Sequence, residues 1–343
     1  MYRITNNSND DIQAVINIYN ETTRRNRTIE QHQWEWFESP YKNTSYIITT
    51  NKNEVIGHHG LLTVELDYKG QRYRMGKTEN TIIKKGFGPA YPKNEMAMFK
   101  EYSSQYDVLM TTAAWGVTRR IREKLGYKYF ASYVNHVALV DFSFIKSRVK
   151  STALKSMVAF LSPVLNLFLF RKRVDENYYQ EFKRLDESDL YLLSELYEKV
   201  KNQFGFMQTR SSVFLKYRFL DNPYSEFFIM HLYQEQEVVG SVIVSLMDDK
   251  LMIEDILVKE LDSTQEILNR LYNHAQTNKS AKVIIFSTLV GSLLDKRYRH
   301  FFRKTTGESS PVVMISNNIK DDNKVDLTVE NLYFTRLTNE GIS

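Results

Sequence analysis

The sequence predicts an α+β protein built from two similar units, each a mixed α/β sheet with helices on it, joined by a basic amphipathic helix. The chain has 343 residues, which suits two domains of about 150 residues each. Its content of 42% hydrophobic and 25% charged residues is typical of a globular protein and excludes a disordered one. In both halves, hairpin patterns are followed by a β-α-β-α-β pattern, which implies a mixed sheet.

An internal repeat relates the two units. Residues 40–57 and 223–240 share five identities at one offset of 183 residues, without a gap. The matched pairs are Pro40 and Pro223, Tyr41 and Tyr224, Glu54 and Glu237, Val55 and Val238, Gly57 and Gly240, with Trp34 and Trp36 opposite the aromatic residues Tyr217 and Phe219. An offset of half the chain indicates a duplicated domain, and the alternative is two generic hairpins with similar turns. We expect an N-terminal domain at 1–143, a connecting helix at 144–175 and a C-terminal domain at 176–343.

The first unit is expected to open with a helix and to continue as hairpins. The patterns predict a helix at 11–20, strands at 46–50, 55–66 and 73–83, a helix at 93–104, a strand at 107–112, a helix at 117–125 and a strand at 127–142. The turn at 68–71, which contains Gly70, joins two of these strands as a hairpin. Gly126 follows a helix where a C-cap glycine is favoured.

The second unit repeats this order. The patterns predict helices at 187–202 and 211–219, strands at 227–233, 238–246 and 251–258, a helix at 263–275, a strand at 283–287, a helix at 291–302 and two final strands. Asp262 or Ser263 is expected to cap the long helix, because short polar side chains bind the free N–H groups at helix starts.

The connecting segment is basic and apolar. Residues 142–174 contain no Asp or Glu and carry seven Lys or Arg side chains. The uncharged run at 156–170 is shorter than the roughly 20 residues that a spanning helix needs. On a helical wheel it has a narrow polar stripe and a wide apolar face. Two interpretations stay open: a linker helix buried between domains, and a helix at 146–173 lying on an anionic membrane surface.

Charge and composition exclude several classes of site. Without the seven positive charges of the connecting segment, the net charge of +5 falls to −2, which argues against a nucleic-acid partner. The chain has no Cys, so it can hold neither a disulfide nor a thiolate zinc site, and its seven His residues show no metal-binding spacing. The polar N-terminal residues resemble no signal peptide. We expect a cytoplasmic protein that holds no metal and that, under the second interpretation of the connecting segment, lies peripherally on the inner face of the membrane.

Four stretches resemble the GNAT superfamily of acyl-CoA-dependent N-acyltransferases. In the first half they read VIGHHGLL at 55–62, GKTENT at 76–81 and REKLGY at 122–127; in the second half, LMIEDIL at 251–257. The whole chain resembles the tandem GNAT proteins of bacterial surface-polysaccharide gene clusters. This resemblance implies two tandem GNAT-like domains and acetyl-CoA, or another acyl-CoA, as co-substrate.

In this family, the turn after the fourth strand binds the CoA pyrophosphate through backbone N–H groups at a helix N-terminus. The resemblance places this turn at Lys84, Lys85, Gly86, Phe87 and Gly88. Its glycine spacing departs from the family pattern, and Pro89 and Pro92 lack N–H donors. The matching loop at 259–263 has two acids and no glycine, so the first half is the better candidate for CoA.

The acceptor amine must lose a proton before it attacks a thioester. A carboxylate on the fourth strand often takes this proton in GNAT enzymes, and Glu79 matches its position. His58 and His59 are alternatives that should point to opposite faces of a strand, and we expect His58 to bind substrate. Asp255 on the matching strand is expected either to bind the substrate amine or to order the domain interface. Arg122 occupies the position at which many family members have a Tyr that acts as the general acid.

The resemblance implies direct acyl transfer in a ternary complex to an amine, with a lipid- or nucleotide-linked amino sugar of a surface glycan as acceptor. Two alternatives remain: a non-catalytic binding or scaffold protein, and an aminoacyl-tRNA-dependent transferase of the Fem type. The sequence leaves the acyl group, the acceptor and the oligomeric state open.

Overall fold

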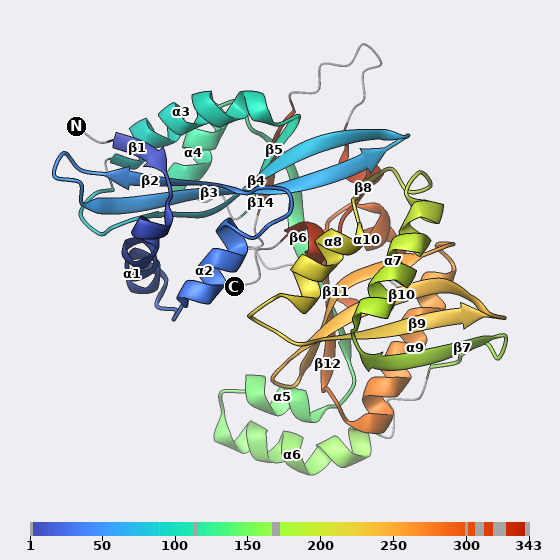
Figure 1. Cartoon of the computed structure of the whole chain (residues 1–343). Coiled ribbons are helices and arrows are strands. Elements are labelled where there is room, and N and C mark those ends of the chain that lie inside the picture. The colour runs from blue at the N-terminus through green and yellow to red at the C-terminus, as the bar shows by residue number, and fades with distance from the viewer. Residues whose placement is uncertain are drawn as a thin grey trace.

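The computed structural model describes residues 3–88, 90–112, 116–166, 172–298, 301–305, 312–317 and 327–339. Two α/β halves lie side by side and are connected by one continuous path of paired strands (Figure 1). The first half contains β1 (Arg3–Asn6), α1 (Ile12–Thr23), α2 (Ile29–Trp36), β2 (Thr44–Thr49), β3 (Val55–Tyr68), β4 (Gln71–Ile83), α3 (Ala90–Tyr102), β5 (Val108–Thr111), α4 (Gly116–Lys124) and β6 (Lys128–Leu139), with short 3₁₀ turns η1 (Asn9–Asp11) and η2 (Ser103–Gln105).

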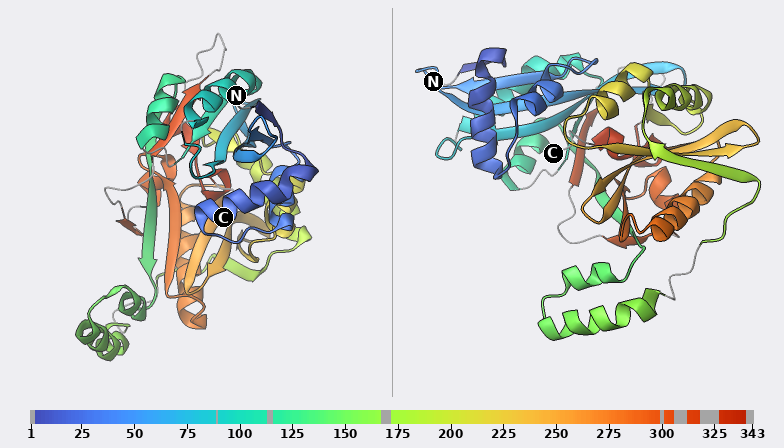
Figure 2. Two further views of the ribbon diagram at one scale, coloured as in Figure 1. Left: turned by 90° about the vertical axis from the view of Figure 1, so that its left-hand side faces the viewer. Right: turned by 60° about the horizontal axis from the view of Figure 1, so that its bottom comes forward.

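The connecting segment contains two helices, α5 (Ser143–Arg148) and α6 (Thr152–Asn166), where the sequence indicated one. Val149, between them, has an extended backbone that ends α5. In Figure 2 the two helices form a hairpin that stands off the body of the protein at one end. Residues 167–171 of the expected helix, including Arg171, lie outside the described residues. Among the helices that the structure describes, none is long and apolar enough to cross a membrane.

The second half follows the predicted order and adds short elements. It contains β7 (Tyr178–Arg184), α7 (Glu187–Val200), β8 (Phe206–Gln208), α8 (Ser212–Leu215), the π-helical η3 (Lys216–Leu220), β9 (Phe227–Gln234), β10 (Glu237–Met247), β11 (Lys250–Val258), α9 (Ser263–Asn278), β12 (Val283–Leu289), α10 (Leu293–Tyr298), β13 (Arg303–Thr305), β14 (Val312–Asn317), η4 (Val329–Asn331), β15 (Leu332–Tyr333) and α11 (Arg336–Asn339). Asp262 occupies the N-cap position of α9, but its side chain makes none of the expected hydrogen bonds to the first N–H groups of the helix. Gly126 follows α4 with a φ of +89°.

Strand exchange joins the two halves. The sheet runs β1-β2-β3-β4-β5-β14-β6-β12-β11-β10-β9-β7, so β14, from near the C-terminus, lies between two strands of the first half. The strand β6 pairs with β14 along residues 128–132 and with β12 along residues 133–139. Because each half uses a strand from the other, we expect the two halves to unfold together.

The repeat offset of 183 residues recurs in the structure. Thr28 caps α2 and Ser211 caps α8, each with its side-chain oxygen accepting a backbone N–H three residues on. Trp34 stacks on its repeat counterpart Tyr217 with ring centroids 4.9 Å apart, and its indole N–H donates to the Tyr217 carbonyl at 2.9 Å. Trp34 and Tyr217 occupy equivalent positions in the repeat and contact each other, as residues near an approximate two-fold axis between the halves would. Duplication of a domain stays a prediction, and the contact between Trp34 and Tyr217 is consistent with it.

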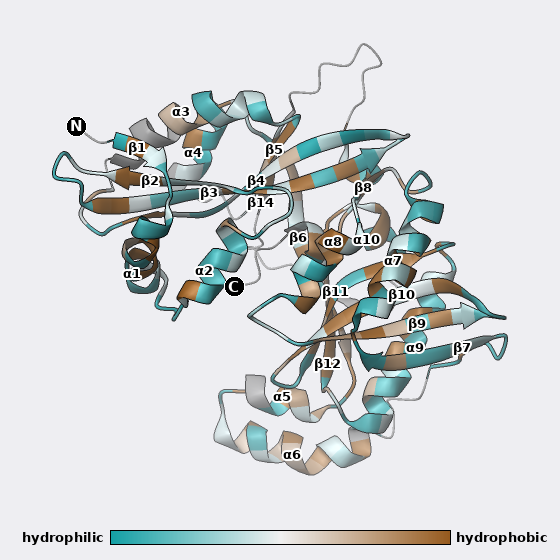
Figure 3. Ribbon diagram, in the orientation of Figure 1, coloured by the Kyte–Doolittle hydropathy of each residue, from teal (hydrophilic) through white to brown (hydrophobic). Residues whose placement is uncertain are grey.

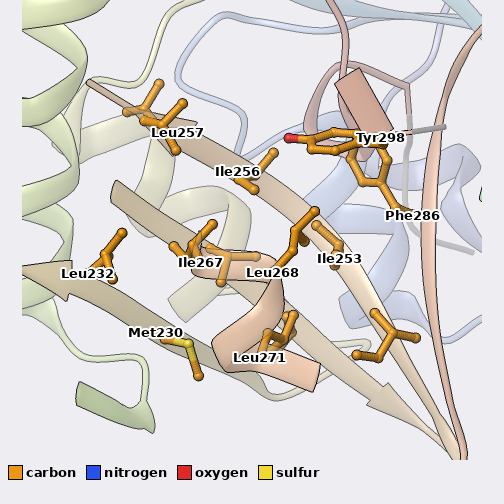
Figure 4. Packing of buried hydrophobic residues seen from close by; sticks show 14 of the residues in the cluster. Met230, Leu232, Ile253, Ile256, Leu257, Ile267, Leu268, Leu271, Phe286 and Tyr298 are labelled. Atoms are coloured by element: carbon orange, nitrogen blue, oxygen red, sulfur yellow. The ribbon is translucent and has the colours of Figure 1, made fainter. Parts of the chain in front are cut away.

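Helices cover both faces of the first sheet, and α9 covers the second. Ile82 of β4 packs with α1, whereas its neighbour Ile83 packs in the cluster that includes α3, as strand alternation requires. In the second half, Ile253 of β11 and Ile267 and Leu271 of α9 are fully buried in the largest hydrophobic cluster (Figure 4). Figure 3 shows that the edge strand β7 is mostly hydrophilic, in keeping with its exposed side chains.

Candidate functional site

The strand β4 separates from β5 part of the way along its length. The two strands pair in parallel from Met75 to Thr78, opposite residues 108–111, and β4 then continues to Ile83. At the point of separation β4 has a bulge. Gly60 of β3 pairs with Glu79 and His58 of β3 pairs with Ile82, so two residues of β4 lie opposite one residue of β3. Asn80, inside the bulge, has a φ of +49°. Bulges turn side chains out of the regular alternation and often lie beside active sites.

Glu79 lies at this bulge and forms an ion pair with Lys77, two residues earlier on the same face of the strand. The Lys77 side chain is 1% exposed and that of Glu79 is 23% exposed. The carboxylate therefore compensates a buried ammonium group and still reaches solvent. An accessible carboxylate held by a neighbouring cation can accept a proton from a bound amine.

Glu35 of α2 is a buried carboxylate near this pair that the sequence analysis did not identify. It accepts from the Arg27 guanidinium at 2.7 Å and from the Asn80 amide at 3.1 and 3.2 Å. Burial raises the pKa of Glu35 to about 7, although Arg27 acts in the opposite direction. The repeat could have drawn attention to it, because Glu35 matches Arg218 between the two aromatic pairs described above.

A small cavity of about 40 Å³ lies between the halves, next to Glu35 and Lys77. Residues of both halves line it, among them Trp34 and Tyr217. It is also lined by Gln208 and Thr338, each 1% exposed. Within the described ranges, neither polar atom of the Gln208 amide nor the Thr338 hydroxyl has a hydrogen-bond partner. Buried polar atoms are rarely left in this state, so the cavity suits water or a polar ligand.

The two adjacent histidines of β3 point to opposite faces, as predicted. His59 stacks on Tyr102 beside α3, whereas His58 lies edge-on to Trp36 of α2. His58 Nδ1 donates to the Asn80 carbonyl at 2.9 Å, and its Nε2 accepts from the Ser45 hydroxyl at 2.8 Å. Both ring nitrogens are thus bonded to protein groups. The role of His58 in substrate binding stays a prediction, and its visible contacts tie β2 to the bulge of β4.

We expect His58 to make folding stability depend on pH. Burial lowers its pKa to about 3, so the folded ring stays neutral while the unfolded chain protonates below pH 6.5. The unfolded state then binds more protons, and stability falls as the pH drops from 6.5 toward 3. The expected loss from this one residue is about 2 kcal/mol at pH 5.

Urea unfolding of the wild type and His58→Gln at pH 7 and pH 5 tests this expectation. The variant should lose about 2 kcal/mol less than the wild type between these pH values. The raised pKa of Glu35 acts with the opposite sign in both proteins and cancels in the comparison. His274→Gln is the matched control, because His274 is less buried. Equal pH dependence in the wild type and His58→Gln would contradict a neutral folded His58.

The predicted pyrophosphate-binding turn forms a tight loop between β4 and α3. The Phe87 N–H donates to the Lys84 carbonyl at 3.1 Å, and Gly86 has a φ of +93° that favours glycine. Lys84 pairs with Glu54 at 2.7 Å, which raises the pKa of the lysine, and Lys85 is exposed. A Cβ atom at Gly88 would meet no neighbouring atom within 4 Å. The loop is thus open at Gly88.

Asp255 occupies the ladder position that corresponds to Glu79. Glu79 pairs with Gly60, Asp255 pairs with Ile243, and Gly60 and Ile243 are 183 residues apart. Asp255 is 1% exposed, accepts two hydrogen bonds from Arg210 at 2.7 and 2.8 Å, and accepts one from Thr335 at 2.9 Å. The structure therefore places Asp255 in an interior ion pair, apart from the residues that line the cavity.

A metal centre or a second groove could also mark a site. Within the described ranges, no group of three or more His, Asp or Glu side chains is arranged to hold a metal ion. A wide surface groove of about 750 Å³ lies between α7 and the β9–β10 turn. Its charged residues Lys199 and Glu237 pair with each other at 2.8 Å, and it lies in the second half, away from β4.

Comparisons with known proteins identify the fold. Neither the protein-family models nor the curated protein sequences give a match. Among solved structures, a GCN5-related N-acetyltransferase from Anabaena variabilis aligns with a TM-score of 0.64 at 14% identity, over 93% of this chain and 73% of that one. N-myristoyltransferase of Saccharomyces cerevisiae with bound myristoyl-CoA gives 0.62 at 10% identity, over 92% and 82%. A conserved protein of Enterococcus faecalis, named a probable N-acyltransferase, gives 0.60 at 11% identity, over 92% and 72%. The predicted GNAT-like fold is confirmed over nearly the whole chain.

Proposed function

We propose that the protein is an acyl-CoA-dependent N-acyltransferase. The observation that carries this proposal is the bulge of β4, which presents Glu79 where β4 parts from β5, paired with Lys77, a residue that lines the cavity between the halves. The similar fold of the acetyl- and myristoyltransferases named above supports it. Glu79, its partner Lys77 and the turn at 84–88 all belong to the first half, so the acyl donor is assigned to that half.

In the proposed reaction, Glu79 takes a proton from the acceptor's ammonium group. The free amine then attacks the thioester carbonyl carbon, the N–C bond forms and the C–S bond breaks. CoA leaves as a thiolate and takes up the second proton that the nitrogen loses. The ion pair with Lys77 holds the Glu79 carboxylate in place before transfer.

The proposed acceptor is the amine of an amino sugar in a surface-glycan precursor, as the resemblance to tandem proteins of polysaccharide clusters implies. The cavity lined by Lys77, the partner of Glu79, supports a hydroxyl-rich acceptor. The Gln208 amide can donate to one hydroxyl and accept from another, and the Thr338 hydroxyl is also without a partner among the residues that the structure describes. Because about 40 Å³ holds only one or two waters, an acceptor would have to widen this opening as it binds.

Calorimetric titration with acetyl-CoA tests the donor site. We expect micromolar affinity, and we expect Lys84→Gln/Lys85→Gln to weaken it about tenfold, because two exposed cations each contribute up to about 1 kcal/mol. Lys69→Gln/Lys279→Gln, which removes two exposed lysines elsewhere, is the matched control.

The other results of this titration are equally informative. No binding at millimolar acetyl-CoA would reject the acyl-CoA proposal and favour a tRNA-dependent or non-catalytic protein. If the affinity for acetyl-CoA is the same in Lys84→Gln/Lys85→Gln and the wild type, the acyl-CoA proposal stands, but the pyrophosphate must bind somewhere other than this turn.

A further inference from the structure

The helix α6 contacts the rest of the protein with its polar side. Asn166 donates to the Asp141 carboxylate at 3.0 Å and accepts from the Phe142 N–H at 2.8 Å. Ser162, one turn earlier, is buried. Helices on the surface of a protein in water normally do the reverse and bury their apolar face. The orientation of α6 therefore calls for a partner on its other side.

The opposite side of α6 is an exposed apolar face. Its members are Leu154 (48% exposed), Met157 (51%), Phe160 (81%), Leu161 (37%) and Val164 (53%). Four of them are spaced three or four residues apart, so they form one stripe along the helix. The hairpin of α5 and α6 stands clear of both halves, so a flat surface could reach this stripe (Figure 2). Exposed apolar stripes of this kind mark interaction sites.

The charged residues near the apolar stripe indicate whether its partner is a protein or a lipid surface. Lys146, Lys150 and Lys155 are exposed on or between the two helices, and Lys172 and Arg173 are exposed just after them. No acidic residue occurs from 142 to 174. A binding face for another protein would be expected to pair cations with some acids, whereas an anionic lipid surface attracts cations only. An apolar stripe beside a wholly basic border is the pattern of helices that lie in a membrane interface.

We propose that the α5–α6 hairpin binds an anionic membrane surface, with the apolar stripe of α6 inserted at the level of the headgroups. Phe160 and Val164 enter the apolar layer, while the anionic surface attracts the exposed Lys146 and Lys150 and, from the polar side of α6, the exposed Lys155. This places the protein peripherally on the membrane, and it holds whether or not the protein transfers acyl groups.

Co-sedimentation of the full chain with phosphatidylcholine vesicles, with and without phosphatidylserine, tests this proposal. We expect binding to the anionic vesicles that weakens as salt is added. Lys146→Gln/Lys150→Gln/Lys155→Gln should lower the affinity about fivefold per lysine. Phe160→Ser/Val164→Ser should abolish sedimentation, because the inserted area is lost.

Two control variants match these changes. Tyr191→Ser/Val213→Ser removes two side chains that are 64% and 65% exposed on the second half, and should sediment like the wild type. Lys52→Gln/Lys69→Gln/Lys128→Gln removes three exposed lysines of the first half. Equal binding to neutral and anionic vesicles, or binding to neither, would overturn the proposal. So would a dimer in light scattering that Phe160→Ser/Val164→Ser dissociates, because the stripe would then bind a second copy of the chain.

Discussion

Glu79→Gln is expected to lower turnover about 10²- to 10⁴-fold and to leave the affinity for acetyl-CoA nearly unchanged. The amide cannot accept the proton of an ammonium group, so the attacking amine would have to form without help. The substitution keeps the size of the side chain and an oxygen that can still accept from Lys77. The donor turn at 84–88 is a separate part of the chain, so binding of the thioester should survive.

Release of the CoA thiol provides the measurement. The chain has no Cys, so a thiol-reactive dye reports only the product. Glu65→Gln is the matched control, because this carboxylate also lies on a strand of the first sheet and pairs with a cation, Arg72, away from the bulge. Thermal unfolding of both variants separates loss of activity from loss of fold.

Unchanged turnover in Glu79→Gln would remove Glu79 as the base and make Glu35 the next residue to test. Its pKa of about 7 suits proton transfer at neutral pH. Glu35→Gln removes the partner of the buried Arg27, so its effect on activity is interpretable only beside its effect on stability.

Local patterns predicted most of the helices and strands. Strands β3, β4, β10 and β11 were expected within a few residues of their ends, because alternation and the turn at Gly70 are local signals. The exchange of β14 and β6 between the halves was not predicted, since strand pairing across 180 residues leaves no short-range pattern. The helix α2 was also missed: its Trp-rich sequence has no regular apolar period, and its fold depends on burial against β3 and η3.

The candidate site was predicted in part. The position of Glu79 on a strand was implied by the family resemblance, and the structure makes that strand the fourth because β1, which was not predicted, precedes it. The opposite directions of His58 and His59 followed from strand alternation. Glu35 and Gln208 were not expected, because both become functional candidates only through burial at an interface that the strand exchange creates. Composition predicted a single helix at 144–175, and the division into α5 and α6 was not expected. The outward direction of the apolar stripe depends on contacts of Asn166 and Ser162.

Asp255→Asn is expected to destabilise the protein by about 3–5 kcal/mol and to have little direct effect on acceptor binding. The guanidinium of Arg210 is fully buried between the rings of Tyr197 and Tyr333, and Asp255 supplies the negative charge next to it. Removing that charge leaves a buried cation uncompensated. The cost should appear in urea unfolding as a lower midpoint with an unchanged slope.

Two further variants separate the structural role of Asp255 from binding of a substrate amine. Asp249→Asn breaks a surface pair with Lys282 and should cost no more than about 1 kcal/mol. Arg210→Leu/Asp255→Leu removes both buried charges and should recover much of the stability that Asp255→Asn loses, because apolar side chains can replace a buried ion pair. If Asp255→Asn instead unfolds like the wild type and raises KM for the acceptor, the carboxylate binds the amine. The second half would then hold the acceptor, at the ladder position that matches Glu79 in the first.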